Sequence, residues 1–508
     1  MTCKNIERLK KIKELNADKT WVNSDLYRLM FKPDYYVIAY EKIKSKPGNL
    51  AKGTDGKNID GFSLKTIEGI IKEMRDESFK FSPARRVLIP KPNGKTRALG
   101  IATTRDKVVQ EVIKNILETI YEDTFSEKSH GFRPNLGCHT ALKDIRNEWS
   151  GVTWIIEGDI KGFFDNIDHN ILINILRKRI NDERFINLIR KALNAGFMIS
   201  KEFKNSLVGT PQGSIVSPIL ANIYLNEFDE FVNEKIIKEM ERGVDKKNRK
   251  INPEHRRISR KISTLEDKLE DKSLDRLKLV KEIKSLRNQL FNTPAADQND
   301  KDYVRIKYVR YADDWCIGVN GSKADAEAIK QACAEFLDEK LNLELSLEKT
   351  TIIHAKTERA FFLGTIIHVG TKKPKIAKVL RNGKVFYKRV AGWTPIMEAP
   401  IDKLVKKLVE TGFCHPDGNP KCCNKYILLD DNQIVDYFSS VMNGIINYYS
   451  FVDNYVDLRR IQYILQYSAA KTLAGKHRSS VAKVFKKYNY AGYNYVNRSI
   501  VGIMFVLE

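Results

Sequence analysis

Two adjacent aspartates, Asp313 and Asp314, interrupt an otherwise apolar stretch of this sequence. Tyr308-Val309-Arg310-Tyr311 leads up to them and Trp315-Cys316-Ile317 follows, a pattern that predicts two β-strands joined by a tight turn. Two carboxylates at such a tip are costly, because each loses hydration and the two charges repel each other. A divalent cation would offset both costs, so the pair indicates a metal site. For an isolated pair the alternative is a turn exposed to water.

A second acidic position favours the metal site. Asp159 follows the apolar run Trp154-Ile155-Ile156, whose β-branched residues predict a buried strand. Two carboxylate sites carried by strands can meet in the fold and hold two metal ions about 3.5–4 Å apart. One ion then activates an attacking hydroxyl and the other stabilises the leaving group, which is the arrangement that nucleotide polymerisation needs.

The charge balance indicates a nucleic-acid partner. The chain has 508 residues, with 88 Lys+Arg against 64 Asp+Glu and a formal net charge of +24. Nucleic-acid phosphate is the usual partner of such a positive field, and a surface charged for solubility is the alternative. The hydrophobic fraction of 42% suits a globular protein, and the length predicts about three or four domains.

The sequence also bears on the compartment. It contains no apolar run of roughly 18 residues and no apolar signal core, so we expect no membrane partner. We expect a cytoplasmic protein in a bacterium, or a protein of the organelle matrix if an organelle encodes it. Seven scattered cysteines favour a reducing environment. Cys414, His415, Cys422 and Cys423 lie close together in the sequence. We interpret these cysteines as ordinary thiols, with a zinc site as the alternative.

Hydrophobic periodicity predicts a mixture of helices and strands, which fits an α+β fold better than a βαβ sheet. Residues 85–101 are predicted to form a β-hairpin with its turn at Pro92-Asn93-Gly94, and Ser63 is predicted to cap a helix. From about residue 390 to about residue 490 we expect helices alone. The predicted helices are Ile6–Leu15, Ser24–Phe31, Ser63–Glu77, Arg105–Tyr121, Ile401–Thr411, Asn432–Tyr449 and Leu458–Leu473.

Residues 246–290 have a composition of their own, with 15 Lys+Arg against 7 Asp+Glu. Apolar residues recur at helical spacing, and the phase slips around Asp271-Lys272-Ser273, which predicts an antiparallel helical hairpin. RNA contact and a solvated spacer are equally compatible with this composition. The recurring apolar residues are Ile258, Ile262, Leu265, Leu269, Leu277, Val280, Ile283, Leu286 and Leu290.

Seven motifs follow one another along the chain. They are Ile89-Pro90-Lys91 with Gly94 to Ile101, His130-Gly131-Phe132-Arg133-Pro134, Asp159 to Phe164, Gly209-Thr210-Pro211-Gln212-Gly213-Ser214, Tyr311 to Asp314, Leu345 to Thr350, and Phe361-Phe362-Leu363-Gly364. In this order they resemble the group II intron-encoded reverse transcriptase (maturase) family. The resemblance covers nearly the whole chain, because residues 31–63 resemble the family's extra upstream motif and Gly412-Phe413-Cys414 with Tyr448-Tyr449 resembles its thumb, called domain X.

The resemblance implies a right-hand polymerase with fingers, palm and helical thumb, preceded by a helical N-terminal extension. The expected domains are the extension at 1–80, the fingers at 81–150, the palm at 151–375 with the basic hairpin inserted at 235–300, and the helical thumb or maturase domain X at 376–508. Many relatives also carry a C-terminal HNH endonuclease with cysteine pairs. We expect no endonuclease and no RNase H domain here.

The resemblance also assigns roles by position. It implies that Asp159, Asp313 and Asp314 bind two Mg²⁺ ions, for which Mn²⁺ could substitute, and are the catalytic residues. The residues implied to bind the incoming nucleotide are Lys91, Arg97, Phe164 and Gln212, with the ring of Phe164 excluding a 2′-hydroxyl. Lys349 is implied as a candidate general acid for the pyrophosphate leaving group. A basic thumb helix is implied to bind RNA through Lys471, Lys476, Arg478, Lys483, Lys486 and Lys487.

The expected function is RNA-dependent DNA synthesis by an intron-encoded enzyme that also assists splicing. The implied partners are group II intron RNA in a lariat ribonucleoprotein, target DNA as primer, and deoxynucleoside triphosphates. Two alternatives remain. One is a splicing-only maturase whose polymerase fold serves as scaffold, and the other is a domesticated bacterial reverse transcriptase of retron or defence type.

Overall fold

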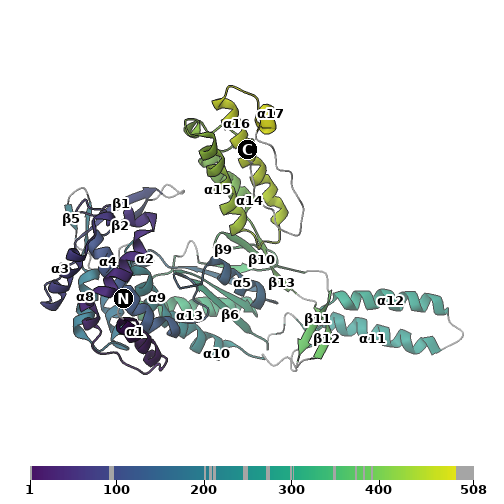
Figure 1. Ribbon diagram of the computed structural model, residues 1–508. Coiled ribbons are helices and arrows are strands. Elements are labelled where there is room, and N and C mark those ends of the chain that lie inside the picture. Colours follow the sequence, from purple (N-terminus) through teal and green to yellow (C-terminus); the bar gives the residue numbers. More distant parts are fainter. Residues whose placement is uncertain are drawn as a thin grey trace. The chain divides into compact units, whose positions relative to one another are not determined.

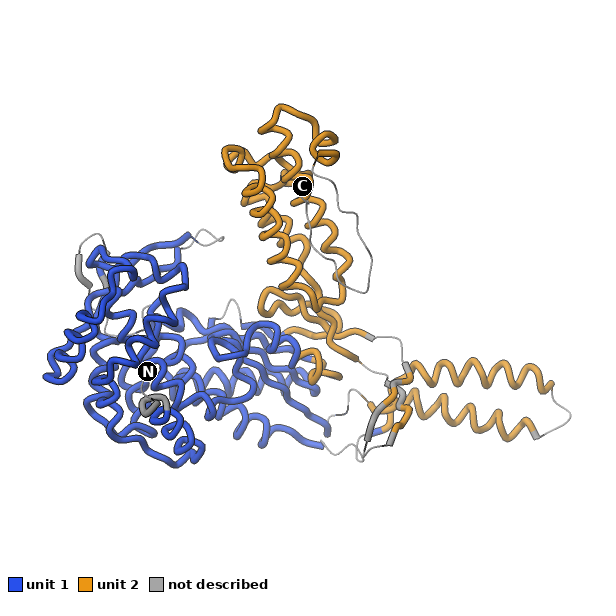
Figure 2. Tube along the Cα trace, in the orientation of Figure 1, with its two compact units in different colours: residues 1–144, 154–250, 298–352 blue, residues 145–153, 251–297, 353–508 orange. Residues whose placement is uncertain are grey.

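The structure is a computed structural model that describes residues 3–90, 96–199, 202–204, 209, 213–243, 250–270, 275–297, 300, 302–346, 350–371, 375–381, 384–390 and 393–487. The chain forms two compact units (Figure 2). Unit 1 comprises residues 1–144, 154–250 and 298–352, and unit 2 comprises residues 145–153, 251–297 and 353–508. The Lys91, Gln212 and Lys349 predictions fall outside the described residues.

Unit 1 combines helices with two sheets (Figure 1). Its α-helices are α1 (Cys3–Asn16), α2 (Pro33–Lys44), α3 (Leu64–Arg75), α4 (Thr104–Tyr121), α6 (Phe163–Asn166), α7 (His169–Arg177), α8 (Glu183–Leu193), α9 (Ser217–Phe231), α10 (Lys238–Met240) and α13 (Lys323–Leu341). A π-helical segment, η5 (Val232–Ile237), joins α9 to α10. Helix α5 (Cys138–Glu148) and strand β8 (Thr351–His354) each begin in unit 1 and end in unit 2.

The sheet that carries the acidic residues has the strand order β6-β7-β3-β8, with β6 (Arg305–Tyr311), β7 (Asp314–Asn320) and β3 (Trp154–Asp159). Strands β6 and β7 form the predicted hairpin, closed by the pair Tyr311 and Asp314. Strand β3 runs antiparallel to β7, and its register pairs Asp159 with Asp314. The strands predicted from the apolar runs are therefore confirmed, and they are direct neighbours.

A second sheet has the order β2-β1-β4-β5, with β1 (Ala84–Pro90), β2 (Thr96–Ile101), β4 (Phe197–Ile199) and β5 (Glu202–Lys204). Strands β1 and β2 form the hairpin that the sequence predicts, and Ile89 pairs with Arg97 near its tip. The predicted turn at Pro92-Asn93-Gly94 lies outside the described residues.

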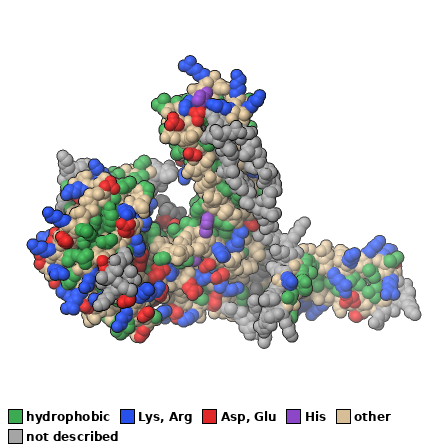
Figure 3. All heavy atoms as spheres, viewed as in Figure 1, with side chains coloured by type: hydrophobic (Ala, Val, Ile, Leu, Met, Phe, Trp, Pro, Cys, Tyr) green, Lys and Arg blue, Asp and Glu red, His purple; other side chains and the backbone are tan. Residues whose placement is uncertain are grey.

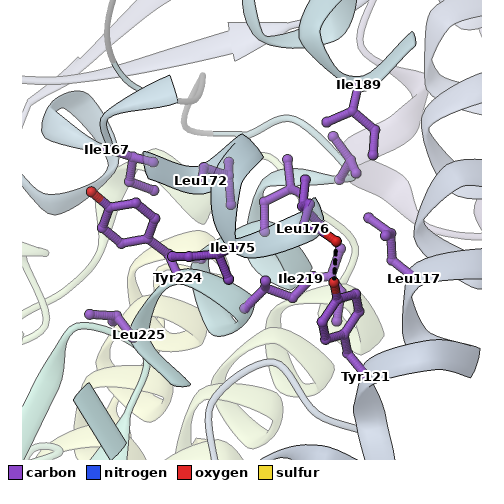
Figure 4. Close-up of a cluster of buried hydrophobic side chains, with 14 of the residues drawn as sticks. Leu117, Tyr121, Ile167, Leu172, Ile175, Leu176, Ile189, Ile219, Tyr224 and Leu225 are labelled. Carbon is purple, nitrogen blue, oxygen red and sulfur yellow. Dashed lines mark hydrogen bonds between the residues drawn. The ribbon is translucent and has the colours of Figure 1, made fainter. Parts of the chain in front are cut away.

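The helices of unit 1 are held by one large apolar core. Figure 4 shows part of it, where α7 meets α4, α8 and α9. Leu172 and Leu176 of α7 are fully buried, and the hydroxyl of Tyr121 donates a hydrogen bond to the carbonyl oxygen of Leu176 at 3.3 Å. The Ser63 cap is confirmed, because its hydroxyl accepts from the backbone N–H of Thr66.

Unit 2 contains strands and helices. Its strands are β9 (Ala360–Phe362), β10 (Thr365–Thr371), β11 (Lys375–Arg381), β12 (Lys384–Val390) and β13 (Trp393–Glu398), with sheet orders β13-β10-β9 and β11-β12. Its helices are α11 (Pro253–Asp267), α12 (Arg276–Asn292), α14 (Ile401–Glu410), α15 (Asp431–Tyr448), α16 (Leu458–Lys476) and α17 (Val481–Lys487). The last four enclose an apolar core of their own.

The helical hairpin is confirmed as α11 and α12, which lie side by side (Figure 1). Two of the recurring apolar residues lie outside its core: Leu277 and Val280 are 77% and 46% exposed, and Leu279 packs inward in place of them. The reason is geometric. At 100° per residue, Leu277 lies about 120° from Ile283 around the helix, so it cannot face the same partner.

Three further predictions differ from the structure. Helix α2 was not predicted, although Pro33 at its first turn is a favoured start. The expectation of helices alone from about residue 390 is wrong, because β13 occupies Trp393–Glu398. The basic stretch 471–487 is two helices, α16 and α17, with a break after Lys476 where Arg478 has a left-handed φ of 47°.

None of the helices in the described part of the chain combines the length and the apolar character that crossing a bilayer requires.

Gly158 in β3 supplies a test of this packing. A Cβ atom at this position would lie 2.1 Å from the buried indole ring of Trp315, so Gly158→Ala should lower the free energy of unfolding by about 1–3 kcal/mol. Gly69→Ala in α3 is the matched control, since its Cβ would meet nothing within 4 Å and should stabilise the helix by about 0.5–1 kcal/mol. Urea unfolding measures both variants, and equal shifts would contradict the packing described for β3 and β7.

Candidate active site

The candidate site is built on the three predicted aspartates, which the sheet brings to one place. Asp159 ends β3 and stands directly opposite Asp314, the first residue of β7. Directly opposite residues in antiparallel strands have Cα atoms about 4.5–5.5 Å apart. Asp313 is the residue before Asp314, in the two-residue turn that follows Tyr311. All three side chains are partly exposed.

The turn has an unusual backbone. Ala312 has a left-handed φ of 56°, which lets the two-residue turn close. Gly131, from the His130 to Pro134 motif, lies against it: a Cβ on Gly131 would be 2.3 Å from the backbone nitrogen of Ala312. The backbone N–H of His130 donates to the carbonyl oxygen of Arg310, at 2.9 Å. The motif that holds Gly131 therefore supports the turn that holds Asp313.

A buried ion pair lies beneath this turn. Arg310 and Asp229 are both fully buried and are joined by two hydrogen bonds, Nε to Oδ1 at 2.7 Å and Nη2 to Oδ2 at 2.6 Å. Burial disfavours the charge of Arg310, but the charge of Asp229 outweighs it, so the pKa of Arg310 is raised. The buried guanidinium therefore stays charged beside the side chain of Asp229, a paired arrangement that a protein interior tolerates.

Arg310 also bonds to the turn itself and to the motif beside it. Its Nη1 donates to the carbonyl oxygen of Ala312 at 2.9 Å, and its Nη2 donates to the Ser129 hydroxyl at 2.8 Å. The amide of Asn222 donates to the carbonyl oxygen of Gly131 at 2.8 Å. Tyr308 donates to Asp229 at 2.7 Å, and burial first, then the charge of Asp229, raises the pKa of Tyr308 well above its ordinary value. This network, which the sequence analysis missed, fixes the position of the turn.

Phe164 stands five residues after Asp159, in the short helix α6, and its side chain is only 7% exposed. Its ring packs edge-to-face against Phe163, with centroids 5.2 Å apart, and against Phe132, with centroids 6.4 Å apart. The helix begins after Gly162, whose φ of 57° is left-handed. The chain thus turns directly after β3, and the turn leads into the short helix that carries the ring of Phe164.

The described residues on either side of Gln212 in the sequence are held by hydrogen bonds. Before it, the imidazole Nε2 of His169 lies 2.7 Å from the carbonyl oxygen of Gly209. After it, the side-chain oxygen of Gln110 in α4 accepts from the Ser214 hydroxyl at 3.0 Å and from the Ile215 N–H at 3.1 Å. Gly209 is therefore bound to α7, and Ser214 is bound to α4.

The segment that leads to Lys349 runs alongside Asp159. The N–H of Ser346 donates to the carbonyl oxygen of Asp159 at 2.9 Å, and the N–H of Lys161 donates to that of Glu344 at 2.9 Å. Arg97 is exposed near the tip of the β1–β2 hairpin. The structure therefore describes Arg97 and Phe164 of the predicted nucleotide-binding residues.

The predicted RNA-binding residues fall into two groups. The ammonium group of Lys471 donates to the carbonyl oxygen of Pro420 at 2.8 Å, and that of Lys476 bonds to the carbonyl oxygen of Leu429 at 2.7 Å and to Asp431 at 2.8 Å. These two lysines hold parts of unit 2 together. The other four are exposed, on α17 or just before it: Arg478, Lys483, Lys486 and Lys487.

The donor set at the aspartates fits a divalent cation. Carboxylate oxygens are preferred ligands of Mg²⁺, and like charges at opposite strand positions are destabilising unless a cation offsets them. Among the described residues, no three His, Cys, Asp or Glu side chains are already gathered closely enough to hold a metal ion. The backbone thus brings the three aspartates to neighbouring positions, but their carboxylates do not yet converge on one point.

Comparison with known proteins decides the family. Residues 89–251 match the reverse transcriptase (RNA-dependent DNA polymerase) family, and residues 393–500 match the type II intron maturase family. The Group II intron-encoded protein LtrA of Lactococcus lactis subsp. cremoris is 37% identical over 491 residues, which cover 95% of this chain and 79% of LtrA. This chain belongs to the group II intron-encoded reverse transcriptase and maturase family.

Other relatives come from organelles as well as bacteria. The Putative COX1/OXI3 intron 1 protein of Saccharomyces cerevisiae is 38% identical over 485 residues, covering 94% of this chain and 56% of that protein. Nuclear intron maturase 2, mitochondrial, of Arabidopsis thaliana is 26% identical over 519 residues. The predicted family and activity are confirmed: the chain is an RNA-directed DNA polymerase with a maturase role in intron splicing. Reverse transcriptases generally need divalent metal ions.

The ion pair under the turn is open to a direct test. Asp229→Ala should lower the free energy of unfolding by about 3–5 kcal/mol, because it leaves the charge of Arg310 buried without its partner. Replacing both residues, as Asp229→Leu with Arg310→Met, should recover most of that loss. Denaturant unfolding measures each variant.

The control is Lys238→Ala, which breaks an exposed pair with Glu234 and should change the stability by less than about 1 kcal/mol. A loss for Asp229→Ala no larger than that of the control would mean that the buried pair does not hold the structure.

Proposed function

We propose that Asp159, Asp313 and Asp314 are the catalytic carboxylates and hold two Mg²⁺ ions while the enzyme copies intron RNA into DNA. The observation that carries this proposal is the register of β3 and β7, which sets Asp159 opposite Asp314 at the end of the hairpin that also holds Asp313. Oxygen ligands of this kind suit Mg²⁺, and Mn²⁺ accepts the same set.

The bound ions would activate the primer hydroxyl and stabilise the leaving pyrophosphate. In this chemistry the role of the protein is to hold the carboxylates in fixed positions. The buried guanidinium of Arg310 holds the Ala312 carbonyl, and the backbone of Gly131 packs closely against Ala312. A site preorganised in this way does not have to reorder its groups at the moment of reaction.

The incoming nucleotide would meet side chains from three segments. Arg97, with Lys91, would bind the triphosphate from the β1–β2 hairpin, because a guanidinium and an ammonium neutralise phosphate charge. Phe164 would lie under the sugar and leave no room for a 2′-hydroxyl. Gln212 would contact the new base pair, and its described neighbours in sequence, Gly209 and Ile215, are bonded to His169 and Gln110. Lys349 would protonate the leaving pyrophosphate.

In the right-hand description of polymerases, the β1–β2 hairpin with its sheet belongs to the fingers, the β6-β7-β3-β8 sheet belongs to the palm, and α14 to α17 form the thumb or domain X. Helices α1 to α3 form the N-terminal extension. This division keeps the proposed parts 1–80, 81–150, 151–375 and 376–508, except that β4 and β5 join the fingers sheet, and it adds the strands β11 to β13 to the last part.

The thumb would bind intron RNA through the exposed cations at its end. Arg478, Lys483, Lys486 and Lys487 are the candidates, while Lys471 and Lys476 serve the fold through their carbonyl contacts. Figure 3 shows further Lys and Arg side chains along the surface of the α11–α12 hairpin. We propose that the enzyme acts in a ribonucleoprotein with excised intron lariat and copies it by extending a nick in target DNA.

The activity of the aspartates has a direct test. Asp313→Asn and Asp159→Asn should each lower primer extension on an RNA template with Mg²⁺ by a factor of at least about 1000, since each removes a charge that metal-dependent transfer requires. Asp165→Asn, which changes an exposed carboxylate six residues after Asp159, is the control and should keep most of the activity.

Undiminished DNA synthesis by Asp313→Asn would refute the role of these carboxylates. Wild-type protein that binds intron RNA but incorporates no deoxynucleotides would instead favour the splicing-only alternative.

The RNA-binding assignment predicts a change in salt dependence. Replacing Lys483 and Lys486 together with Ala should weaken binding of intron RNA and reduce the slope of log K against log[salt] by about 2, since two phosphate contacts are lost. Lys235→Ala with Lys238→Ala removes the same charge from residues paired with Glu239 and Glu234, and should leave the slope unchanged.

Lys476→Ala distinguishes the second group. It should lower the unfolding midpoint, because it removes the ion pair with Asp431 and the hydrogen bond to the carbonyl oxygen of Leu429. The salt slope of RNA binding should stay that of the wild type. Filter binding at several salt concentrations measures the slopes. An equal change in slope for both double variants would contradict the assignment.

A further inference from the structure

Phe132 is an aromatic residue whose ring the fold does not bury. Its side chain is 46% exposed, while the residue before it, Gly131, is buried and the residue after it, Arg133, is partly buried. Exposure of one apolar side chain is ordinary by itself. The backbone at this residue is not ordinary, because Phe132 has a left-handed φ of 59°.

Left-handed backbone is costly for a bulky side chain, and glycine or asparagine adopts it more readily. Such strain persists only where the surrounding structure fixes the backbone, and it gathers at functional sites. An exposed ring contributes little to folding. The combination of strain and exposure therefore indicates that the ring of Phe132 serves something other than stability.

The chain on both sides of Phe132 is held firmly. On one side, the carbonyl oxygen of Gly131 accepts from the Asn222 amide, and Gly131 lies against the turn at Ala312. On the other side, the guanidinium of Arg133 donates to the carbonyl oxygens of Ser126 and Ser129 at 2.7 and 2.8 Å. Arg133 also bonds to the Glu122 carboxylate at 2.8 Å. These contacts hold the chain on both sides of Phe132 in place.

The position of the ring indicates its partner. Its centroid is 6.4 Å from that of Phe164, with the two planes at 72°. Phe164 is the residue proposed to lie under the nucleotide sugar, and Gly131 touches the turn that carries Asp313. Phe132 therefore contacts Phe164 through its ring and follows the residue that touches the turn, and 46% of its side chain is exposed.

We propose that Phe132 is a specificity-determining residue, which forms with Phe164 a wall of two rings against the sugar of the nucleotide being added. This inference rests on the proposed role of Phe164 and extends it. An aromatic wall offers a 2′-hydroxyl no hydrogen-bond partner, so a ribonucleotide would lose a water contact without replacement. The two rings pack at a steep angle and restrict each other's movement, which would keep the space for the sugar narrow.

The test compares deoxynucleotide with ribonucleotide incorporation. Phe132→Asn and Phe132→Gly both remove the ring and both suit the left-handed backbone, so the fold should keep its stability or gain some. The ratio of kcat/KM for a deoxynucleotide to that for the matching ribonucleotide should fall by about 10-fold in both variants. Phe132→Tyr keeps the ring and should keep the ratio. Leu64→Asn, which removes an exposed apolar side chain from α3, is the control.

Three outcomes decide the matter. A lower ratio in both ring-free variants, with unchanged unfolding midpoints and a normal ratio in Phe132→Tyr, supports the proposal. An unchanged ratio, or an equal fall in the use of both nucleotides, overturns it. Phe164→Val is measured in parallel: if its ratio equals that of the wild type, the role proposed for Phe164 fails, whatever the Phe132 variants show.

Discussion

The register of β3 and β7 is the constraint on which the site depends. Pairing of the apolar residues along these strands leaves Asp159 and Asp314 opposite each other at the end of the ladder. A slip by one residue would send every side chain of β3 to the other face and would drive Gly158, which faces the ring of Trp315, out of place. The packing that stabilises the sheet therefore also forces two negative charges together, a cost that a divalent cation can offset.

A second set of contacts keeps the turn at the end of this ladder in one conformation. Arg310 lies at a fully buried position of β6, and its charge is compensated by Asp229 from α9. Through Arg310 the turn is bonded to the segment around Ser129, and that segment in turn carries Phe132. The turn that carries Asp313, the buried ion pair and the segment that carries Phe132 are thus joined by hydrogen bonds. Buried networks of this kind hold a single arrangement when every member is satisfied.

The sequence could predict the parts of the site that depend on local patterns. Apolar runs interrupted by Asp159 and by Asp313-Asp314 indicated strands ending in carboxylates, and the order of the motifs indicated the family. Long-range packing was beyond it. The Arg310–Asp229 pair joins residues 81 positions apart, and single Arg and Asp residues in a chain with 30% charged residues carry no signal of burial. A clue was present in Tyr308-Val309-Arg310-Tyr311, where one charge sits inside a predicted buried strand and needs a partner.

Two further differences have their own causes. Leu277 continues the helical spacing of three and four, but it lies about 120° from Ile283 around α12, so it cannot face the same partner. Nothing in the sequence indicates that the ammonium groups of Lys471 and Lys476 reach carbonyl oxygens 51 and 47 residues away. Charge alone could not separate them from Lys483 and Lys486. Strands β11 to β13 were missed because short strands in a region of helices give weak periodicity.

The central claim is that Asp159 and Asp314 repel each other until a divalent cation binds to their carboxylates. The unfolding midpoint as a function of Mg²⁺ concentration measures this directly, in wild-type protein and in Asp314→Asn. We expect the wild type to gain stability as Mg²⁺ rises, and Asp314→Asn to be more stable than the wild type without Mg²⁺ and nearly insensitive to it. Identical Mg²⁺ responses in the two proteins would contradict the account.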